Sequence, residues 1–258
     1  MASGRVASGR GWASGDVAMC GRFVLVTPPD QLARRYGAAL AAGIDPERAL
    51  GYNVGPTREV FGVAGSEAAA GSEAAAGSEA RTLDFYRWGL IPSWADDPGI
   101  GGRMFNARCE TVSSKPSFRS AFARRRLIIP VDGFYEWRGE GGRREPYYFR
   151  SPDGQPLALA GLWEKWRAKT GDGTSSIRSC TIITAPAGPD VAPVHDRMPV
   201  ILDGGAIDAW LEGVETDLLQ DLLVPAPAGR LSGHRVGRAV GNVRNDRPDL
   251  IDEVAGDE

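Results

Sequence analysis

Short runs of apolar residues, bounded by glycine, proline or aspartate, dominate the hydrophobic pattern of this chain. Runs of roughly four to eight such residues are typical of strands packed in a sheet. The strands expected from this pattern lie at 23–26, 60–63, 83–88, 126–137, 146–150, 157–166 and 177–185. Of these, 60–63 and 83–88 are expected to pair with each other across the segment that separates them.

Helical periodicity is scarce in comparison. One helix is predicted over 27–40, where Thr27 offers a capping hydroxyl and two prolines follow in positions that a first helical turn tolerates. Two shorter helices are predicted at 206–211 and 216–223. Many strands with few peripheral helices indicate an α+β protein, a single domain built mainly on antiparallel β-sheet.

Two low-complexity segments interrupt this pattern. Residues 1–18 repeat the tetrapeptide ASGR and have no apolar core, so they predict a disordered extension rather than a signal peptide. Met19 follows directly and offers an alternative start. Residues 65–80 repeat GSEAAA with a six-residue period that suits neither a core strand nor a core helix. They predict a flexible or partly helical loop without a catalytic role, inserted in a domain that spans 19–252.

Composition narrows the class of protein only a little. Hydrophobic residues make up 42% and charged residues 24% of the 258 residues, as in ordinary globular proteins, and no apolar run is long enough to predict a membrane span. The net charge of -3 gives no hint of a nucleic-acid partner. Residues 101–150, however, hold 11 Lys and Arg against 5 Asp and Glu. This basic middle is either a cationic face for phosphates or a solvated charged surface.

The cysteine count is low and odd, which argues against a disulfide framework; the three are Cys20, Cys109 and Cys180. They favour a reducing, cytoplasmic setting. Cys180 lies in an apolar run and is expected to be a buried strand thiol without chemistry.

Cys20 carries a possible chemistry of its own. If residues 1–19 are absent, it has a free α-amine beside its thiol. Such a group condenses with an aldehyde to an imine, which the thiol closes to a thiazolidine ring. The amine has an ordinary pKa near ~8, so much of it is nucleophilic at cellular pH. The competing interpretation is an incidental cysteine near a chain start.

Two further side chains suit proton transfer. Glu136 lies in an aromatic segment, where strand alternation puts it on one face with Phe134 and puts Tyr135 and Trp137 on the other. Aromatic neighbours favour its protonated form, whereas an edge-strand glutamate would simply face water. His195 is one of two histidines and stands in a constrained loop between prolines; it is either functional or a surface histidine. Since no cluster has zinc-like spacing, we expect no metal and no cofactor.

The segment Asn106–Glu110 places an amide, a guanidinium and a carboxylate at alternating positions. As a strand it would present Asn106, Arg108 and Glu110 on one face. Such a row could bind a phosphate or a sugar, or it could be an exposed polar face.

Nine motifs together resemble one known family, the SOS response-associated peptidase (SRAP) family, and occur in its order. They are MCGRF (19–23), YNVGPT (52–57), RWGLIPSW (87–94), NARxE (106–110), DGFYEW (132–137), AGLW (160–163), ITA (183–185), HDRMP (195–199) and VGNVRN (240–245). The resemblance implies a barrel-like SRAP fold and covers the chain from about Met19 to Ile251.

It also implies an activity. Members of the family bind single-stranded DNA and crosslink to abasic sites through an N-terminal cysteine, after a peptidase-like removal of what precedes it. Carried over, the resemblance assigns catalytic roles to Cys20, Asn106, Glu136 and His195. It assigns DNA contacts to Arg22, Trp94, Arg108 and Thr184. It further implies a lyase-like activity, a monomer, and a nucleoid-associated location when the protein is bound to DNA.

The extension before Met19 departs from the family pattern. A misassigned start, autoproteolysis before Cys20 or a blocked nucleophile would each account for it. Two rival functions remain open. An N-terminal-nucleophile cysteine amidohydrolase would use the extension as a propeptide, and a non-catalytic single-strand-binding module would not need Cys20.

Overall fold

The computed structural model describes residues 20–65, 81–139, 144–168, 175–212 and 216–254. The extension 1–18 and all of the 65–80 insertion except Gly65 lie outside this described part. The domain bounds 19–252 and the character of both low-complexity segments therefore remain predictions.

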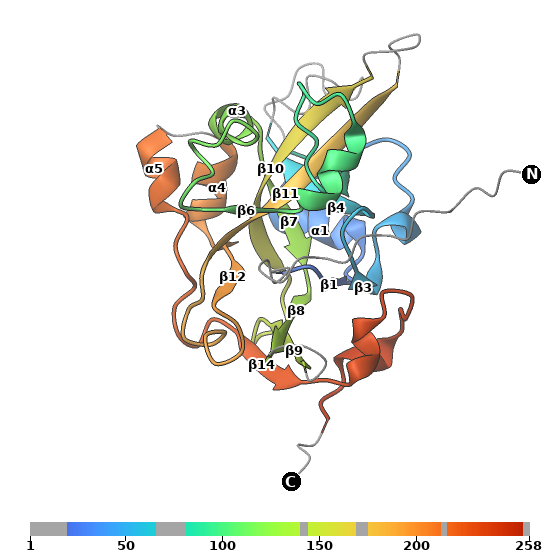
Figure 1. The fold of residues 1–258 in the computed structure, drawn as a ribbon. Coiled ribbons are helices and arrows are strands. Elements are labelled where there is room, and N and C mark those ends of the chain that lie inside the picture. The colour runs from blue at the N-terminus through green and yellow to red at the C-terminus, as the bar shows by residue number, and fades with distance from the viewer. Residues whose placement is uncertain (1–19, 66–80, 140–143, 169–174, 213–215, 255–258) are drawn as a thin grey trace, which may run out of the picture.

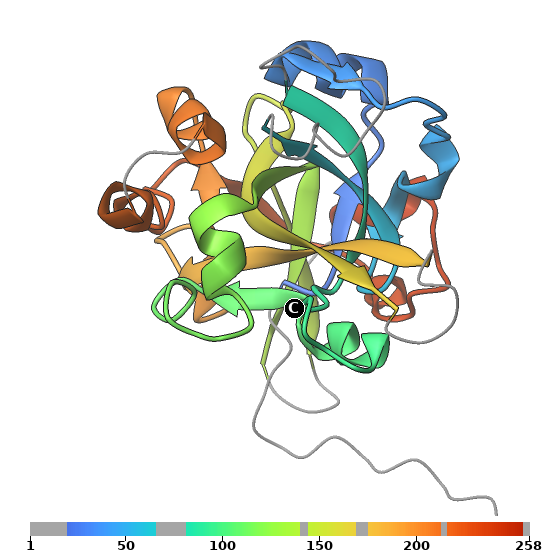
Figure 2. The ribbon, with the colours of Figure 1, turned by 90° about the horizontal axis from the view of Figure 1, so that it is seen from above.

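Five strands close into a barrel, which is the centre of the fold (Figures 1 and 2). Around the ring they are β5 (Arg81–Trp88), β4 (Glu59–Ala64), β7 (Arg126–Val131), β10 (Leu157–Arg167) and β11 (Ser176–Pro186). Four of the neighbouring pairs are antiparallel, and the parallel pairing of β11 with β5 closes the ring. The predicted pairing across the insertion is confirmed, because β4 and β5 are antiparallel with Phe61 opposite Phe85.

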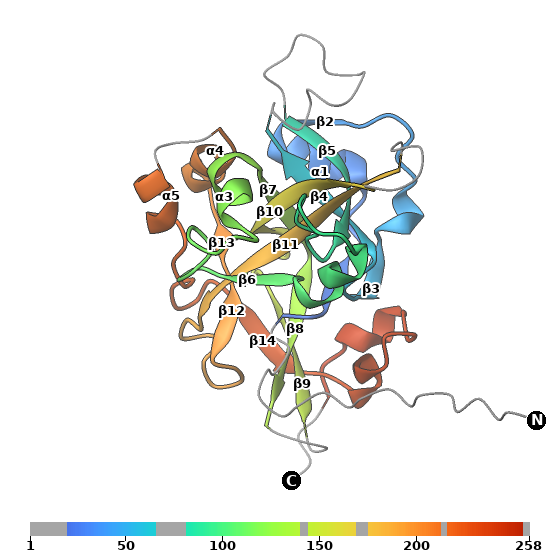
Figure 3. The same ribbon diagram turned by 45° about the horizontal axis from the view of Figure 1, so that its top comes forward.

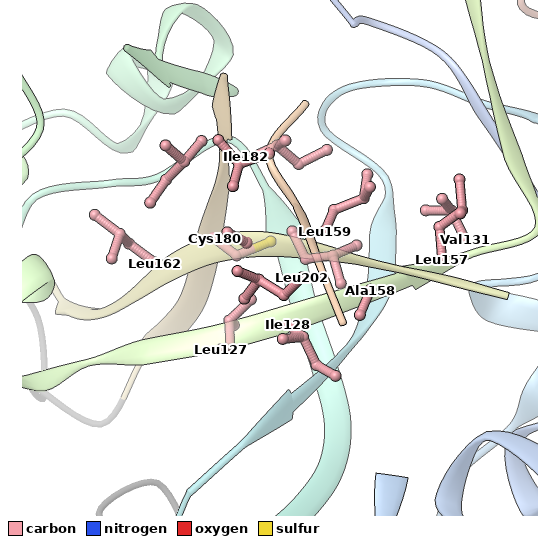
Figure 4. Close-up of a cluster of buried hydrophobic side chains, with 14 of the residues drawn as sticks. Leu127, Ile128, Val131, Leu157, Ala158, Leu159, Leu162, Cys180, Ile182 and Leu202 are labelled. Atoms are coloured by element: carbon pink, nitrogen blue, oxygen red, sulfur yellow. The ribbon is translucent and has the colours of Figure 1, made fainter. Parts of the chain in front are cut away.

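Branched aliphatic side chains from these strands pack together inside the molecule (Figure 4). Leu127 and Ile128 of β7, Leu159 of β10 and Ile182 of β11 are all fully buried. Cys180 lies among them with no exposed surface, and burial raises the pKa of its thiol. The prediction of a buried strand thiol is thus confirmed.

A second, five-stranded sheet lies beside the barrel, and the segment that follows Cys20 forms one of its strands. Its order is β14 (Ser232–Arg235), β9 (Glu145–Arg150), β8 (Gly133–Arg138), β1 (Phe23–Leu25) and β3 (Gly51–Val54). All of its pairings are antiparallel. Four short strands join the barrel sheet, namely β2 (Ala38–Leu40), β6 (Asn106–Arg108), β12 (Arg197–Pro199) and β13 (Ile201–Leu202). The predicted α+β class, mainly antiparallel with a barrel, is confirmed.

Short helices cover the outside of the sheets (Figure 3). The α-helices labelled there are α1 (Pro29–Tyr36), α3 (Arg119–Arg124), α4 (Gly205–Glu212) and α5 (Thr216–Asp221). The described 3₁₀ turns include η1 (Pro46–Arg48), η3 (Pro98–Arg103), η5 (Arg238–Gly241) and η6 (Pro248–Ile251). In the part of the chain described, none of the helices has the length and apolar character to cross a membrane.

The helices predicted at 206–211 and 216–223 correspond to α4 and α5, but the helix predicted over 27–40 is too long. It ends at Gly37, which adopts the left-handed conformation (φ 61°) of a helix C-cap, and 38–40 form β2 instead. Thr27 does not cap it either. Its hydroxyl donates to Asp132 (Oγ1–Oδ1 2.6 Å), and the position before the helix is Pro28.

Asp132 also divides the single strand that was predicted over 126–137. Its carboxylate accepts the main-chain N–H groups of Val26 (2.6 Å) and Thr27 (2.9 Å). The chain turns there from β7 in the barrel to β8 in the second sheet. One hydrophobic run therefore makes two strands that belong to different sheets, and β8 enters the second sheet beside β1.

Candidate functional site

Cys20 is fully buried, and Gly21 and Arg22 separate it from the first residue of β1. Its main-chain N–H donates to Oε1 of Glu136 at 2.7 Å. This contact follows from the register of the second sheet, in which Phe23 of β1 stands opposite Phe134 of β8. Cys20 has a φ of 33°, a left-handed conformation that is unusual for a residue other than glycine.

Glu136 is a buried carboxyl group, 1% exposed, on the strand next to β1. Tyr135 packs on the opposite face of β8, in a separate apolar cluster, as strand alternation predicted. β8 is flanked by β9 and β1, so the edge-strand interpretation is wrong. Burial raises the pKa of Glu136 to about 8, although the N–H of Cys20 lowers it in part. Burial, and next the charge of Glu136, raise the pKa of the Cys20 thiol well above its usual value.

His195 faces the same carboxyl group from the loop between β11 and β12. Its Nε2 lies 4.0 Å from Oε2 of Glu136, and its side chain is 8% exposed. The main-chain N–H of Arg197 donates to Nδ1 at 3.0 Å. The surface-histidine interpretation is therefore wrong, and the structure brings Cys20, Glu136 and His195 together.

β6 lies along β11 in parallel, with Asn106 opposite Ile182 and Arg108 opposite Thr184. Asn106 is half-buried and Arg108 is exposed, whereas Thr184 is fully buried, with its hydroxyl 3.4 Å from the carbonyl oxygen of Ala107. The strand ends at Arg108. The row predicted over Asn106–Glu110 is therefore wrong at its last position.

Glu110 lies in the turn after β6, where its carboxylate accepts two hydrogen bonds from Arg197 (2.7 and 3.0 Å). From the sequence, Glu110 was considered only as part of that row, and Arg197 was not singled out as functional. Both stand within motifs that carry the resemblance, but the contact between them depends on the pairing of β6 and β12 with β11.

Arg22 is half-buried and bound within the protein. Its Nη1 donates to Oδ1 of Asn53 and to the carbonyl oxygen of Val240, both at 3.0 Å, and burial lowers the pKa of the guanidinium. Asn53, fully buried, donates through Nδ2 to the carbonyl oxygens of Val240 (3.1 Å), Asn242 (3.1 Å) and Asn245 (2.9 Å). The two residues thereby attach the C-terminal segment to the strand that follows Cys20. Sequence reasoning missed Asn53 because its partners are main-chain groups far away in the chain.

Trp94 stands on the surface between β5 and η3 and is 54% exposed. It lines a depression together with Asp96, Asp97 and Arg103. Among the described residues, no group of three or more His, Cys, Asp or Glu is arranged to hold a metal ion.

The sequence matches the model of one protein family over most of its length. The family model for SOS response associated peptidase (SRAP) matches residues 19–243. The chain belongs to the SRAP family. The resemblance seen in the sequence is thereby confirmed.

Curated relatives agree with this assignment, and a solved structure shares the fold. The SRAP chain is 37% identical to the abasic site processing protein YoqW of Bacillus subtilis (strain 168), over 91% of this chain and 99% of that one. It is 31% identical to the abasic site processing protein YedK of Escherichia coli (strain K12), over 92% of this chain and 100% of that one. A crystal structure of a protein from Bacteroides thetaiotaomicron has the same fold, with a TM-score of 0.77 at 23% identity over 92% of this chain and 100% of that one.

Proposed function

We propose that this SRAP protein captures the aldehyde of an abasic site in single-stranded DNA as a thiazolidine on Cys20. The observation that carries the proposal is the 2.7 Å hydrogen bond from the nitrogen of Cys20 to the buried carboxyl group of Glu136. It sets the group that would become the α-amine, and with it the thiol, beside a proton donor and acceptor. The names of the relatives supply the abasic site as the object of this chemistry.

Exposure of the amine comes first. Hydrolysis of the Met19–Cys20 peptide bond adds one water, which leaves a carboxylate on Met19 and a free amine on Cys20. The bond to be broken ends at the nitrogen that Glu136 binds, so Glu136 is placed to protonate the departing amine. This step is a cysteine-type autopeptidase activity. If translation began at Met19, this step would remove only one residue, Met19 itself.

Capture of the aldehyde then proceeds in two steps. The amine adds to the carbonyl carbon, and the resulting carbinolamine loses one water to form an iminium ion. The thiol of Cys20 adds to the iminium carbon and releases its proton, which closes the ring. The sum is one thiazolidine and one water from one aminothiol and one aldehyde. Crosslinking thus removes the carbonyl group that would otherwise promote strand cleavage, and reversal of the same steps takes up one water and restores the aldehyde. The lyase-like activity in the proposal would be β-elimination from the iminium ion, before the thiol closes the ring.

Glu136 and His195 serve these proton transfers in the proposal. A carboxyl group with a pKa of about 8 both gives and takes protons near neutral pH, as the loss of water and the addition of the thiol require. The high pKa of the Cys20 thiol makes such a proton acceptor necessary. His195, with Nε2 4.0 Å from Glu136, would assist opening of the sugar ring. Asn106 would orient the opened sugar.

DNA binding in the proposal uses the surface around β6. Arg108 is exposed and suited to a phosphate, while Arg22 would add a second contact despite its internal hydrogen bonds. Trp94, half-exposed, would stack on a base, and Thr184 would line the pocket. The protein would act as a monomer on DNA in the cytoplasm, associated with the nucleoid when bound.

Mass spectrometry of the intact protein tests this proposal. After mixing with a single-stranded oligonucleotide that bears one abasic site, we expect a species with the mass of the chain from Cys20 plus the oligonucleotide, less one water. Cys20→Ser should give no stable adduct, since a hydroxyl group is a much weaker nucleophile than a thiol, but it should keep its affinity for an intact strand. An adduct of equal stability in Cys20→Ser would exclude the thiazolidine. No adduct with the wild-type chain would favour a non-catalytic binding module, and hydrolysis of a small amide instead would favour an amidohydrolase.

A further inference from the structure

The ion pair between Glu110 and Arg197 lies next to the proposed site but has no part in the chemistry above. It is a two-point contact, with Nη1 to Oε1 at 2.7 Å and Nη2 to Oε2 at 3.0 Å. Nη2 of Arg197 also donates to the carbonyl oxygen of Thr184 at 2.7 Å. The side chain of Arg197 is 12% exposed and that of Glu110 is 46% exposed. Such paired contacts hold a guanidinium in one orientation more firmly than a single contact does.

Arg197 connects this pair to His195 through its main chain. Its N–H donates to Nδ1 of His195 at 3.0 Å, while Nε2, on the other side of the ring, lies 4.0 Å from Oε2 of Glu136. An N–H group can only donate, so in this contact Nδ1 accepts. A neutral ring with an accepting Nδ1 carries its hydrogen on Nε2, directed toward Glu136.

Two other groups favour the opposite tautomer. Oδ1 of Asp196 and the carbonyl oxygen of Arg197 both lie 3.2 Å from Nδ1, where each would accept a hydrogen from it. Asp196 is 88% exposed and therefore well solvated. The tautomer consequently depends on how firmly the main chain of Arg197 is held against the ring.

We propose that Glu110 is a positioning residue for His195. By fixing Arg197 it keeps the Arg197 N–H on Nδ1, so that the ring presents Nε2–H to Glu136. Only the consequence for crosslinking rests on the proposed function; the effect on the ring does not. Hydrogen bonds from Arg197 lower the pKa of Glu110 to about 2, so the pair stays charged throughout the neutral range.

The nitrogen NMR signals of the imidazole rings test the proposal without DNA. The chain has two histidines, so His195→Ala assigns the signals of His195 by difference. In the wild type at a pH where the ring is neutral, we expect the signal of an unprotonated Nδ1 and that of a protonated Nε2. Glu110→Gln, which removes the charge and one acceptor, should bring the two signals closer together as the tautomers mix. Glu110→Asp, charged but shorter, should shift them in the same direction, and it serves if Glu110→Gln does not fold.

Asp203→Asn is the matched control, because Asp203 accepts from Arg230 through both oxygens (2.5 and 2.8 Å) and lines a depression with Tyr36 and Arg81 rather than with His195. It should change the melting temperature by a similar amount and leave the His195 signals in place. Signals that do not move in either folded Glu110 variant, or a protonated Nδ1 in the wild type, would overturn the proposal.

Crosslinking rates then test the consequence. Glu110→Gln should slow crosslink formation about tenfold, a part of the roughly 10²–10⁴-fold that a positioned proton-transfer group supplies. In a His195→Ala background the same change should have no further effect. A tenfold loss that persists without His195 would show that Glu110 acts elsewhere. A wild type that forms no crosslink at all would contradict the proposed function, whereas the NMR result would still decide the role of Glu110.

Discussion

At the scale of single residues, the centre of the candidate site is the carboxyl group of Glu136, which is almost completely buried. Glu136 carries no ion-pair partner closer than His195 at 4.0 Å among the described residues, and it instead accepts a main-chain N–H. Burial without a close cation disfavours the ionised form, which explains the direction of its pKa shift. The burial on which its proposed role in proton transfer rests therefore makes Glu136 costly to ionise.

This cost predicts how stability depends on pH. The pKa of Glu136 is about 8 in the folded chain and close to 4.5 when unfolded, so the folded state binds the additional proton between these values. Its contribution to stability is complete below about pH 4.5 and is lost as the pH rises through 8. In a Cys20→Ala background, which lacks the thiol of the proposed self-processing, Glu136→Gln should remove this dependence. Urea unfolding from pH 5 to 9 should show a gain for the variant at high pH of at most about 5 kcal/mol. Parallel curves for the two proteins would contradict the shifted pKa.

At the scale of elements, close packing of β7, β10 and β11 holds the barrel together. Gly161 of β10 lies where an added methyl group would come within 2.8 Å of both Leu127 Cδ1 and the carbonyl oxygen of Thr181. A larger residue at this position would therefore clash both with a side chain and with main-chain atoms.

Gly161→Ala should therefore destabilise the protein by roughly 2–3 kcal/mol, the usual cost of overpacking a core. Chemical denaturation measures the difference. Gly102→Ala is the control, because a methyl group there meets nothing within 4 Å, and its effect should stay below about 0.5 kcal/mol. Equal losses in both variants would mean that the barrel yields to a methyl group more readily than its packing indicates.

The elements also show how far the sequence alone leads. Hydrophobic runs located the strands, because a strand that packs on both faces needs apolar residues throughout. They could not locate the break at Asp132, since its three hydrogen bonds come from Val26 and Thr27, far away in the chain. Of the site, Cys20, Glu136 and His195 were predictable, largely through the resemblance. Contacts such as Glu110 with Arg197 were not, because they join residues 87 positions apart.

At the scale of the whole molecule, the question is where a chain of net charge -3 would bind a polyanion. Several of the basic residues of the 101–150 segment are already committed within the fold. Arg125 pairs with Glu164, Arg126 binds the carbonyl oxygens of Phe122 and Trp210, and Arg138 pairs with Glu145. Exposed Arg108, at the end of β6, is the basic residue of this segment that the proposal assigns to DNA.

Arg108→Glu should weaken binding to an intact single strand and reduce the slope of log affinity against log salt by about 1. Fluorescence anisotropy at several salt concentrations measures both. Arg34→Glu makes the same change of charge on α1, which lies toward the opposite side of the molecule from β6 in Figure 2. It should leave the slope nearly unchanged. Equal effects of the two variants would point to diffuse attraction rather than to a contact at β6.

The pairing of β1 with β8 has a consequence for the order of events during synthesis. Cys20 and Glu136 are 116 residues apart, and His195 follows later still. As the chain leaves the ribosome, Cys20 therefore emerges long before β8, the strand that carries Glu136. A nascent or truncated chain would expose the thiol without Glu136 beside it, and the proposed chemistry can assemble only when about three quarters of the chain has been made.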